Sequence, residues 1–287
     1  MMCCASCGIA GVDDIKLKKC TACKSVRYCG VKCQREHRKQ HKKECKKRAA
    51  ELRDEHLFKQ PESTNLGDCP ICFLPLPLDT TKSSFMECCG KLICNGCEYA
   101  NSIREFEGRS LEDNCPFCRH PAPESEEEIY VTAMKRIEAN DPVALCQMGG
   151  KLFHEGDYKT AFEYLSKAAG LGDFQAHFNL AVMYGVGQGV EEDEKKMIYH
   201  LEEAAIGGHP DARQKLGFIE GDRGEYTRGL KHFIIAAKLG HDRSWEVVKE
   251  SYAEGLVGKE DFASTLSAHQ AAVDAMKSPQ REAAEAS

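Results

Sequence analysis

Residues 20–45 read CTACKSVRYCGVKCQREHRKQHKKEC, and the run CASC at residues 4–7 precedes them. Together these stretches hold four pairs of metal-ligating residues: Cys4 with Cys7, Cys20 with Cys23, Cys29 with Cys33, and His41 with Cys45. A tight turn or one helical turn brings both donors of such a pair to one ion, and thiolates with imidazole are typical of tetrahedral zinc. Alternate pairing predicts a cross-braced module with two ions. One zinc is expected on Cys4, Cys7, Cys29 and Cys33, and the other on Cys20, Cys23, His41 and Cys45.

A second array follows at residues 69–118, so that fifteen of the 17 cysteines belong to one array or the other. Its pairs are Cys69 with Cys72, Cys88 with Cys89, Cys94 with Cys97, and Cys115 with Cys118. The same alternation predicts one zinc on Cys69, Cys72, Cys94 and Cys97, and another on Cys88, Cys89, Cys115 and Cys118. Adjacent cysteines reach a single ion awkwardly, which leaves a weaker or vacant second centre as the alternative. The chain is therefore expected to hold about four Zn²⁺ ions.

The first array resembles the MYND-type zinc finger family over residues 4–45, through Tyr28-Cys29, Cys33-Gln34 and the closing His-x-x-x-Cys. The family register favours His41 over His37 as the imidazole ligand, and Cys3 remains an alternative to Cys4. Arg38 stands where the family usually carries a tryptophan that helps to form a groove for proline-rich peptides. The resemblance therefore implies a client-binding finger without supporting that particular ligand.

The second array, with CPICF, CPFCR and 17 residues between Cys97 and Cys115, resembles an all-cysteine RING finger over residues 69–119. Lys91 stands where many RING fingers have a histidine ligand, and Glu98-Tyr99 replaces a frequent tryptophan. The resemblance implies a ubiquitin ligase that positions a ubiquitin-charged conjugating enzyme. In that role Ile71 and Pro116 would make apolar contacts with the conjugating enzyme, and Arg119 would be the linchpin donor. The alternative is a folded but inactive adaptor.

An internal repeat governs residues 141–277. Ala144, Ala176, Ala212 and Ser244 occupy equivalent places, and Ala-Ala pairs recur at 168–169, 204–205, 236–237 and 271–272. Each repeat reads as two amphipathic helices with glycine at the turns. The second repeat, with Leu180-Ala181, Tyr184-Gly185 and Ala204-Ala205, is similar to Sel1-like repeats, relatives of the tetratricopeptide repeat. Four such repeats predict a helical solenoid that binds clients on an extended surface.

Composition limits the remaining functions. No apolar run is long enough for a membrane span, and no secretory signal is visible, so a reducing intracellular compartment, cytoplasmic or nuclear, is expected. The basic run 38–48 continues a helix expected to end at about residue 58. It could be a nuclear-import or nucleic-acid patch, but no aromatic side chains interleave the cations, so a solvated helix face is favoured and nucleic-acid binding is not expected.

These observations predict a mainly α fold in which two small double-zinc modules precede an α/α solenoid. Residues 59–68 are expected to be a linker, residues 120–140 an acidic linker with a connecting helix, and residues 278–287 a disordered tail. No catalytic nucleophile is identified. The predicted function is a RING-type ubiquitin-ligase-like protein whose MYND and Sel1-like modules hold a client, and the alternative is a non-enzymatic scaffold.

Overall fold

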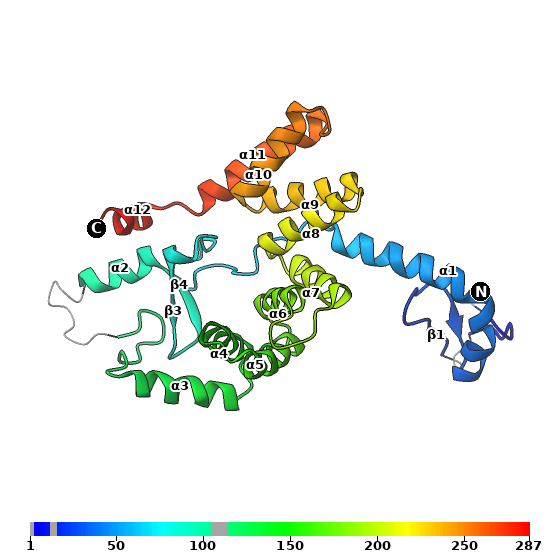
Figure 1. Cartoon of the computed structure of the whole chain (residues 1–287), viewed down its shortest axis with the longest axis horizontal. Coiled ribbons are helices and arrows are strands. Elements are labelled where there is room, and N and C mark those ends of the chain that lie inside the picture. Colours follow the sequence, from blue (N-terminus) through cyan, green and yellow to red (C-terminus); the bar gives the residue numbers. More distant parts are fainter. Residues whose placement is uncertain (1–2, 12–15, 105–113) are drawn as a thin grey trace. The chain divides into compact units, whose positions relative to one another are not determined.

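The structure, a computed structural model, describes residues 3–11, 16–104 and 114–287. Residues 12–15 and 105–113 belong to the two predicted zinc modules but lie outside the described residues. The chain divides into two compact units, Met1–Lys59 and Gln60–Ser287 (Figure 1). Among the described helices, none combines the length and the apolar character that a bilayer crossing requires.

The first unit has little regular structure before its helix. Strands β1 (Lys18–Lys19) and β2 (Arg27–Tyr28) pair antiparallel, and α1 (Val31–Leu57) follows. Buried cysteines and Tyr28 make up most of the core at the strands. So small an apolar core cannot hold a fold without metal, so the cysteines have to stabilise this unit. The helix ends one residue before the position expected from the sequence.

The second unit begins with a small hairpin domain. The 3₁₀ turn η1 (Thr80–Lys82) leads into β3 (Ser83–Met86), which pairs antiparallel with β4 (Lys91–Cys94). Helix α2 (Asn95–Arg104) follows directly. Cysteines share the core of this domain with Leu76 and Ile93, both fully buried.

A connecting helix and a stack of helix pairs complete the unit. The helices are α3 (Glu126–Glu138), α4 (Pro142–Glu155), α5 (Tyr158–Gly170), α6 (Phe174–Val186), α7 (Glu194–Ile206), α8 (Pro210–Asp222), α9 (Tyr226–Lys238), α10 (Asp242–Ala253) and α11 (Lys259–Ala275). Each helix from α4 to α10 packs against the next along the chain. Fully buried alanines at the predicted Ala-Ala pairs, such as Ala168 and Ala204, let the helices approach closely. The predicted mainly α fold with a helical solenoid is confirmed.

The linker before the hairpin domain lies on the solenoid. The Asn65 N–H donates to Gly208 O at 3.2 Å, and Gln60 Nε2 donates to Ile235 O at 3.5 Å. A Cβ on Gly208 would collide with the carbonyl oxygen of Ser63. The linker therefore follows the repeats closely, because glycine at the turn between α7 and α8 allows its backbone to come near.

The C-terminal segment differs from the prediction. Residues 278–287 were expected to be disordered because they are polar, but they form α12 (Pro279–Ala286). This helix packs against α2 (Figure 1). Its N-terminus is capped by Ser278, whose Oγ accepts a hydrogen bond from the Arg281 N–H at 3.2 Å. Arg281 is only 6% exposed, so a contact that the local polarity did not reveal orders the segment.

Candidate metal centres

The first Cys-x-x-Cys pair lies in a tight backbone turn. The Cys4 N–H donates to Ile9 O at 2.8 Å, and the Gly8 N–H donates back to Cys4 O at 2.9 Å. Gly8, directly after Cys7, has a left-handed backbone with φ of 73°. Backbone N–H groups thereby face the sulfur, and hydrogen bonds from Cys7 and Cys29 lower the pKa of the Cys4 thiol to about 6. The turn presents both sulfurs to one side and favours the thiolate.

Three of the other Cys-x-x-Cys pairs lie in the same kind of turn. It recurs at Cys20, Cys69 and Cys115, where the residue after the second cysteine is Lys24, Phe73 and Arg119 with φ of 54°, 57° and 61°. A residue other than glycine in this region costs roughly 1–2 kcal/mol. An unfavourable conformation kept at the same place in three turns indicates that the turn itself serves the thiols.

Four groups of side chains in the described part of the chain could each hold a metal ion, with ligand atoms within 4.8 Å of one another. The groups are Cys4, Cys7, Cys29 and Cys33; Cys20, Cys23, His41 and Cys45; Cys69, Cys72, Cys94 and Cys97; and Cys88, Cys89, Cys115 and Cys118. The structure thus brings together the sixteen residues expected from the sequence, in the expected alternating order. In each module the two groups interleave along the chain, as a cross-brace requires.

His41 and His37 have different positions in the structure. His41 Nε2 lies 3.2 Å from Cys23 Sγ, within its ligand group. His37 Nδ1 instead lies 3.1 Å from the Tyr28 hydroxyl oxygen. The two imidazole rings stack, with centroids 5.6 Å apart and planes 9° from parallel. His37 therefore supports the ring of His41 from the preceding helical turn.

Cys88 and Cys89 reach a common group because they lie in the turn of the hairpin. The Gly90 N–H donates to Met86 O at 2.6 Å, and Gly90 has φ of 65°. In this turn Cys88 Sγ lies 3.3 Å from Cys118 Sγ, and Cys89 Sγ lies 3.9 Å from Cys115 Sγ. A strand would point adjacent side chains to opposite faces, whereas the turn points these two to one side.

An arginine from α3 holds this turn. Arg136 Nη1 donates to Glu87 O at 3.1 Å, and its guanidinium lies 5.8 Å from the centre of the Phe85 ring. Arg136 Nη2 also pairs with Asp141 Oδ2 at 2.6 Å. Asp141 in turn caps α4 by accepting from the Val143 N–H at 2.9 Å. The turn with the adjacent cysteines is therefore anchored to the start of the solenoid, which the sequence did not indicate.

The thiols of one group cannot all ionise without a cation. The hydrogen bond from Cys94 lowers the pKa of Cys69 to about 4, whereas burial raises the pKa of Cys97 to about 12. The Cys69 thiolate also raises the pKa of Cys94. One thiolate forms readily and repels further ones. A divalent cation removes this obstacle because it binds thiolates and displaces their protons.

The donor sets fit zinc. Each described group offers four protein donors, either four sulfurs or three sulfurs and an imidazole nitrogen, which is the composition of a structural zinc site. None of these cysteines is in a disulfide. The chain therefore binds several zinc ions, and these ions stabilise its fold.

The three residues expected to contact a conjugating enzyme lie in the two turns of the hairpin domain. Ile71 is partly buried against the cysteine core, and Pro116 is partly buried in the turn that starts at Cys115. Arg119 is exposed, and its Nη1 donates to Asn101 Oδ1 at 3.1 Å. Phe73, directly after Cys72, is also exposed, and the cysteine spacing gives no sign of this apolar surface.

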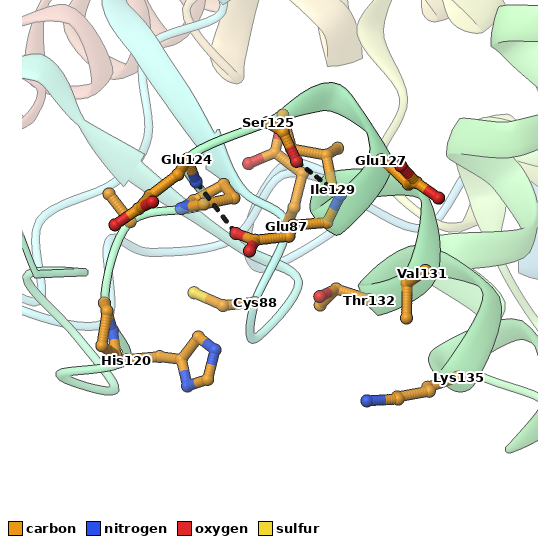
Figure 2. Close-up of a pocket in the computed structure, with 14 residues that line it drawn as sticks. Glu87, Cys88, His120, Glu124, Ser125, Glu127, Ile129, Val131, Thr132 and Lys135 are labelled. Atoms are coloured by element: carbon orange, nitrogen blue, oxygen red, sulfur yellow. Dashed lines mark hydrogen bonds between the residues drawn. The ribbon is translucent and has the colours of Figure 1, made fainter.

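Two grooves adjoin the zinc groups. One, of about 700 Å³, lies between Cys88 and α3, and Figure 2 shows the Cys88 sulfur facing it. Glu128 fixes its rim, because its side chain accepts from the Glu124 N–H at 2.9 Å and its N–H donates to Ser125 Oγ at 3.2 Å. Carboxylates outnumber cations in its lining, so this groove would repel a strand of nucleic acid.

The other groove, of about 500 Å³, lies in the first unit along α1. Val31 there is 61% exposed, and the charged residues of the lining are all basic: Arg35, Arg38, Lys42 and Lys46. These four side chains make the groove cationic.

Comparison with known proteins identifies two modules. A family model described as MYND finger matches residues 4–45. A model described as Sel1 repeat matches residues 142–173, 174–209 and 210–241. The fourth predicted repeat lies beyond these ranges, although α10 and α11 form a helix pair there. The predictions of a MYND finger and of Sel1 repeats are confirmed.

Similar proteins share parts of the chain. HcpC of Helicobacter pylori strain J99, named as a candidate beta-lactamase, is 41% identical over 56 residues, which are 20% of this chain and 19% of that protein. The crystal structure of a Sel1 repeat protein from Oxalobacter formigenes has 21% identity and a TM-score of 0.43, covering 56% of this chain and 63% of that one. A protective antigen of uropathogenic Escherichia coli strains displaying an SLR fold has 20% identity and a TM-score of 0.39, covering 66% of this chain and 41% of that one.

The chain spans less than two thirds of each of these relatives. The two family matches nevertheless agree with the geometry, since one covers the first two cysteine groups and the other covers six helices of the solenoid. The family models therefore identify a MYND finger at residues 4–45 and Sel1 repeats at residues 142–241 of this chain.

Proposed function

We propose that residues 69–119 are a RING-type finger that binds a ubiquitin-charged conjugating enzyme, while the MYND finger and the Sel1 repeats hold a client. The observation that carries this proposal is the interleaved order of the two cysteine groups in the hairpin domain, with an exposed arginine directly after the last ligand. The role needs no nucleophile from this chain. It needs a rigid surface that holds the thioester in a reactive pose.

The sixteen grouped residues are the proposed ligands of four Zn²⁺ ions. When bound, zinc supplies the structural links between loops that have little apolar core of their own. The residues of the chain then do the positioning. Ile71 offers an apolar contact beside the first turn, and Pro116 offers one beside the second.

Arg119 is the proposed linchpin. Its backbone is held in the left-handed conformation by the turn, which limits the directions in which its side chain can extend. The guanidinium has a planar fork of donors that can bond two acceptors together. Its contact with Asn101 is exposed, so exchanging it for acceptors on the conjugating enzyme and ubiquitin costs little.

The MYND finger and the repeats are the proposed client-binding modules. The groove along α1 has four basic side chains in its lining and an exposed Val31, which suits a client segment with acidic and apolar residues. Opposite charges steer such a segment towards the groove.

The test is ubiquitin discharge from a panel of charged conjugating enzymes by the zinc-loaded full chain. Arg119→Ala should slow discharge at least tenfold while the chain keeps its zinc. Asn101→Ala is the control: it removes the partner of Arg119, together with a hydrogen bond to Asn114 O, but keeps the arginine donor, and with its zinc retained it should discharge at the wild-type rate. Equal rates for wild type and Arg119→Ala would remove the linchpin role.

A non-enzymatic scaffold is the second candidate. The packing of the finger favours it, because Arg136 and Arg281 attach the two zinc groups of the finger to segments on either side of the repeats. A finger built in this way can serve as a structural part of the solenoid. Absence of discharge by wild-type chain that holds four zinc ions, with every enzyme of the panel, would favour this candidate.

A further inference from the structure

The C-terminal helix reaches the first zinc group of the finger through one side chain. Arg281 Nη1 donates to Pro75 O at 2.8 Å, and Nη2 donates to Leu74 O at 3.3 Å. Nη2 also lies 3.6 Å from the sulfur of Cys72, one of the four grouped thiols. Nη1 further donates to Met276 O at 2.6 Å, which fixes the guanidinium to its own segment.

The charge of the zinc group accounts for the choice of an arginine. Four thiolates around one Zn²⁺ leave a net charge of about −2, and a buried site concentrates that charge. Arg281 is buried, so its cation is held against these thiolates with little screening by water. Its planar fork bonds a sulfur and backbone carbonyls at the same time, which the single ammonium of a lysine cannot copy.

The surface of α2 is shaped for this helix. A Cβ on Gly96, between the ligands Cys94 and Cys97, would lie 2.8 Å from the Arg281 backbone nitrogen and 2.9 Å from its Cα. Because that contact is with backbone, α12 would have to move if residue 96 carried a side chain. The absence of a side chain at Gly96 and the presence of one at Arg281 therefore serve the same contact.

We propose that residues 278–287 form a clasp on the first zinc centre of residues 69–97, with Arg281 as the positioning residue that neutralises its thiolates. Clasp docking and zinc retention at this centre then depend on each other. Thermodynamic linkage requires the two effects to be equal, so whatever factor the clasp adds to zinc affinity, zinc adds to clasp docking.

This proposal is independent of ligase activity. Gly96 and Asn101 are five residues apart on α2, which places them about 140° apart around the helix. The clasp and Arg119 thus use different faces of α2, and a chain that discharges no ubiquitin can still have a zinc-coupled clasp.

The experiment uses the zinc-loaded full chain with two readouts. Hydrogen exchange at residues 279–286 reports clasp docking, and the alkylation rate of Cys72, read by mass spectrometry, reports metal release at this centre. The variants are Arg281→Ala, which removes the cation, and Gly96→Ala, which displaces the helix but keeps the cation. Gln280→Ala, on the exposed side of α12, is the matched control.

Both test variants should release the clasp and raise the alkylation rate of Cys72 about tenfold, the usual effect of removing a partner of a metal ligand. The alkylation rate of Cys20 in the MYND finger should stay unchanged in both test variants. In Gln280→Ala, hydrogen exchange at residues 279–286 and the alkylation rates of Cys72 and Cys20 should all equal those of the wild type. Arg281→Lys should fall between wild type and Arg281→Ala. A clasp that stays protected in both test variants would overturn the proposal, and so would a released clasp with Cys72 alkylation at the wild-type rate.

Discussion

Gly90→Ala should destabilise the hairpin of β3 and β4 by displacing the guanidinium of Arg136. A Cβ on Gly90 would collide with the guanidinium of Arg136, and it would also stand on a backbone with φ of 65°. The backbone conformation costs roughly 1–2 kcal/mol. The ion pair of Arg136 with Asp141 has side chains 15% and 31% exposed, so its loss costs about 2 kcal/mol, between the values for surface and buried pairs. The total is about 3–4 kcal/mol.

The two contributions separate in a double-mutant cycle. Arg136→Met alone should cost about 2 kcal/mol, and Gly90→Ala added to it should cost only the backbone contribution of about 1–2 kcal/mol. The coupling between the two sites is therefore about 2 kcal/mol. Hydrogen exchange at the amides of β3 and β4 in the zinc-loaded full chain measures the local opening free energy in each variant.

Gly67→Ala is the control for this cycle. Gly67 also has a positive φ, of 66°, but nothing lies within 4 Å of its missing Cβ. Its substitution should cost the backbone contribution alone, and the cost should not depend on Arg136. If Gly90→Ala costs the same in the wild-type chain as in the Arg136→Met variant, the guanidinium does not hold the turn and the reasoning is wrong.

Three further predictions concern the solenoid and the zinc. Burial lowers the pKa of His209 in the folded chain to about 4, so between that pH and about 6.5 the unfolded chain binds one more proton than the folded chain. The free energy of unfolding should therefore fall as the pH drops through this window. The variant His209→Asn should reduce this loss by about 3 kcal/mol. Gly149→Ala should destabilise by about 1–3 kcal/mol, because its Cβ would lie 2.7 Å from Leu165 Cγ. A chelator should unfold both zinc modules but leave Trp245, 5.3 Å from the Phe262 ring, in its packed environment.

Urea unfolding followed by fluorescence of the single tryptophan measures the stability changes at His209 and Gly149. Near-ultraviolet circular dichroism measures the effect of the chelator on the environment of Trp245. Asparagine can replace His209 as the cap of α8, so an unchanged pH slope would exclude this histidine as the cause. Gly150→Ala is the control for Gly149, because open space surrounds its missing Cβ; it should stabilise by about 0.5–1 kcal/mol. Loss of the tryptophan signal on chelation would show that the repeats need the metal.

The ligand pairs could be predicted from the sequence because short spacing brings two donors to one ion: Cys4 and Cys7 can meet in one turn whatever surrounds them. Consecutive pairs would supply four donors to an ion as well as alternate pairs do, so the alternation rests on the ligand groups of the structure. The repeats could be predicted for a similar reason, since Ala-Ala pairs such as 204–205 recur where helices must approach closely. Both signals are local and are repeated along the chain.

The supporting contacts could not be predicted in this way. Arg136 and Arg281 are ordinary surface residue types in polar segments, and their partners lie 49 and 209 residues away in the chain. One local signal for the C-terminal helix was present, since Ser278 followed by Pro279 is a typical helix start. The polar composition of the segment nevertheless predicts disorder, because a segment of that composition has too little apolar surface to order itself without the rest of the fold.

The contact between Cys72 and Arg281 has a consequence for biosynthesis. The ribosome delivers the cysteine 209 positions before the arginine. Domains generally fold from the N-terminus during synthesis. The Cys69, Cys72, Cys94 and Cys97 group therefore waits for the guanidinium of Arg281 until the repeats have been translated, and a nonsense codon anywhere in the repeats also deprives this upstream group of its arginine.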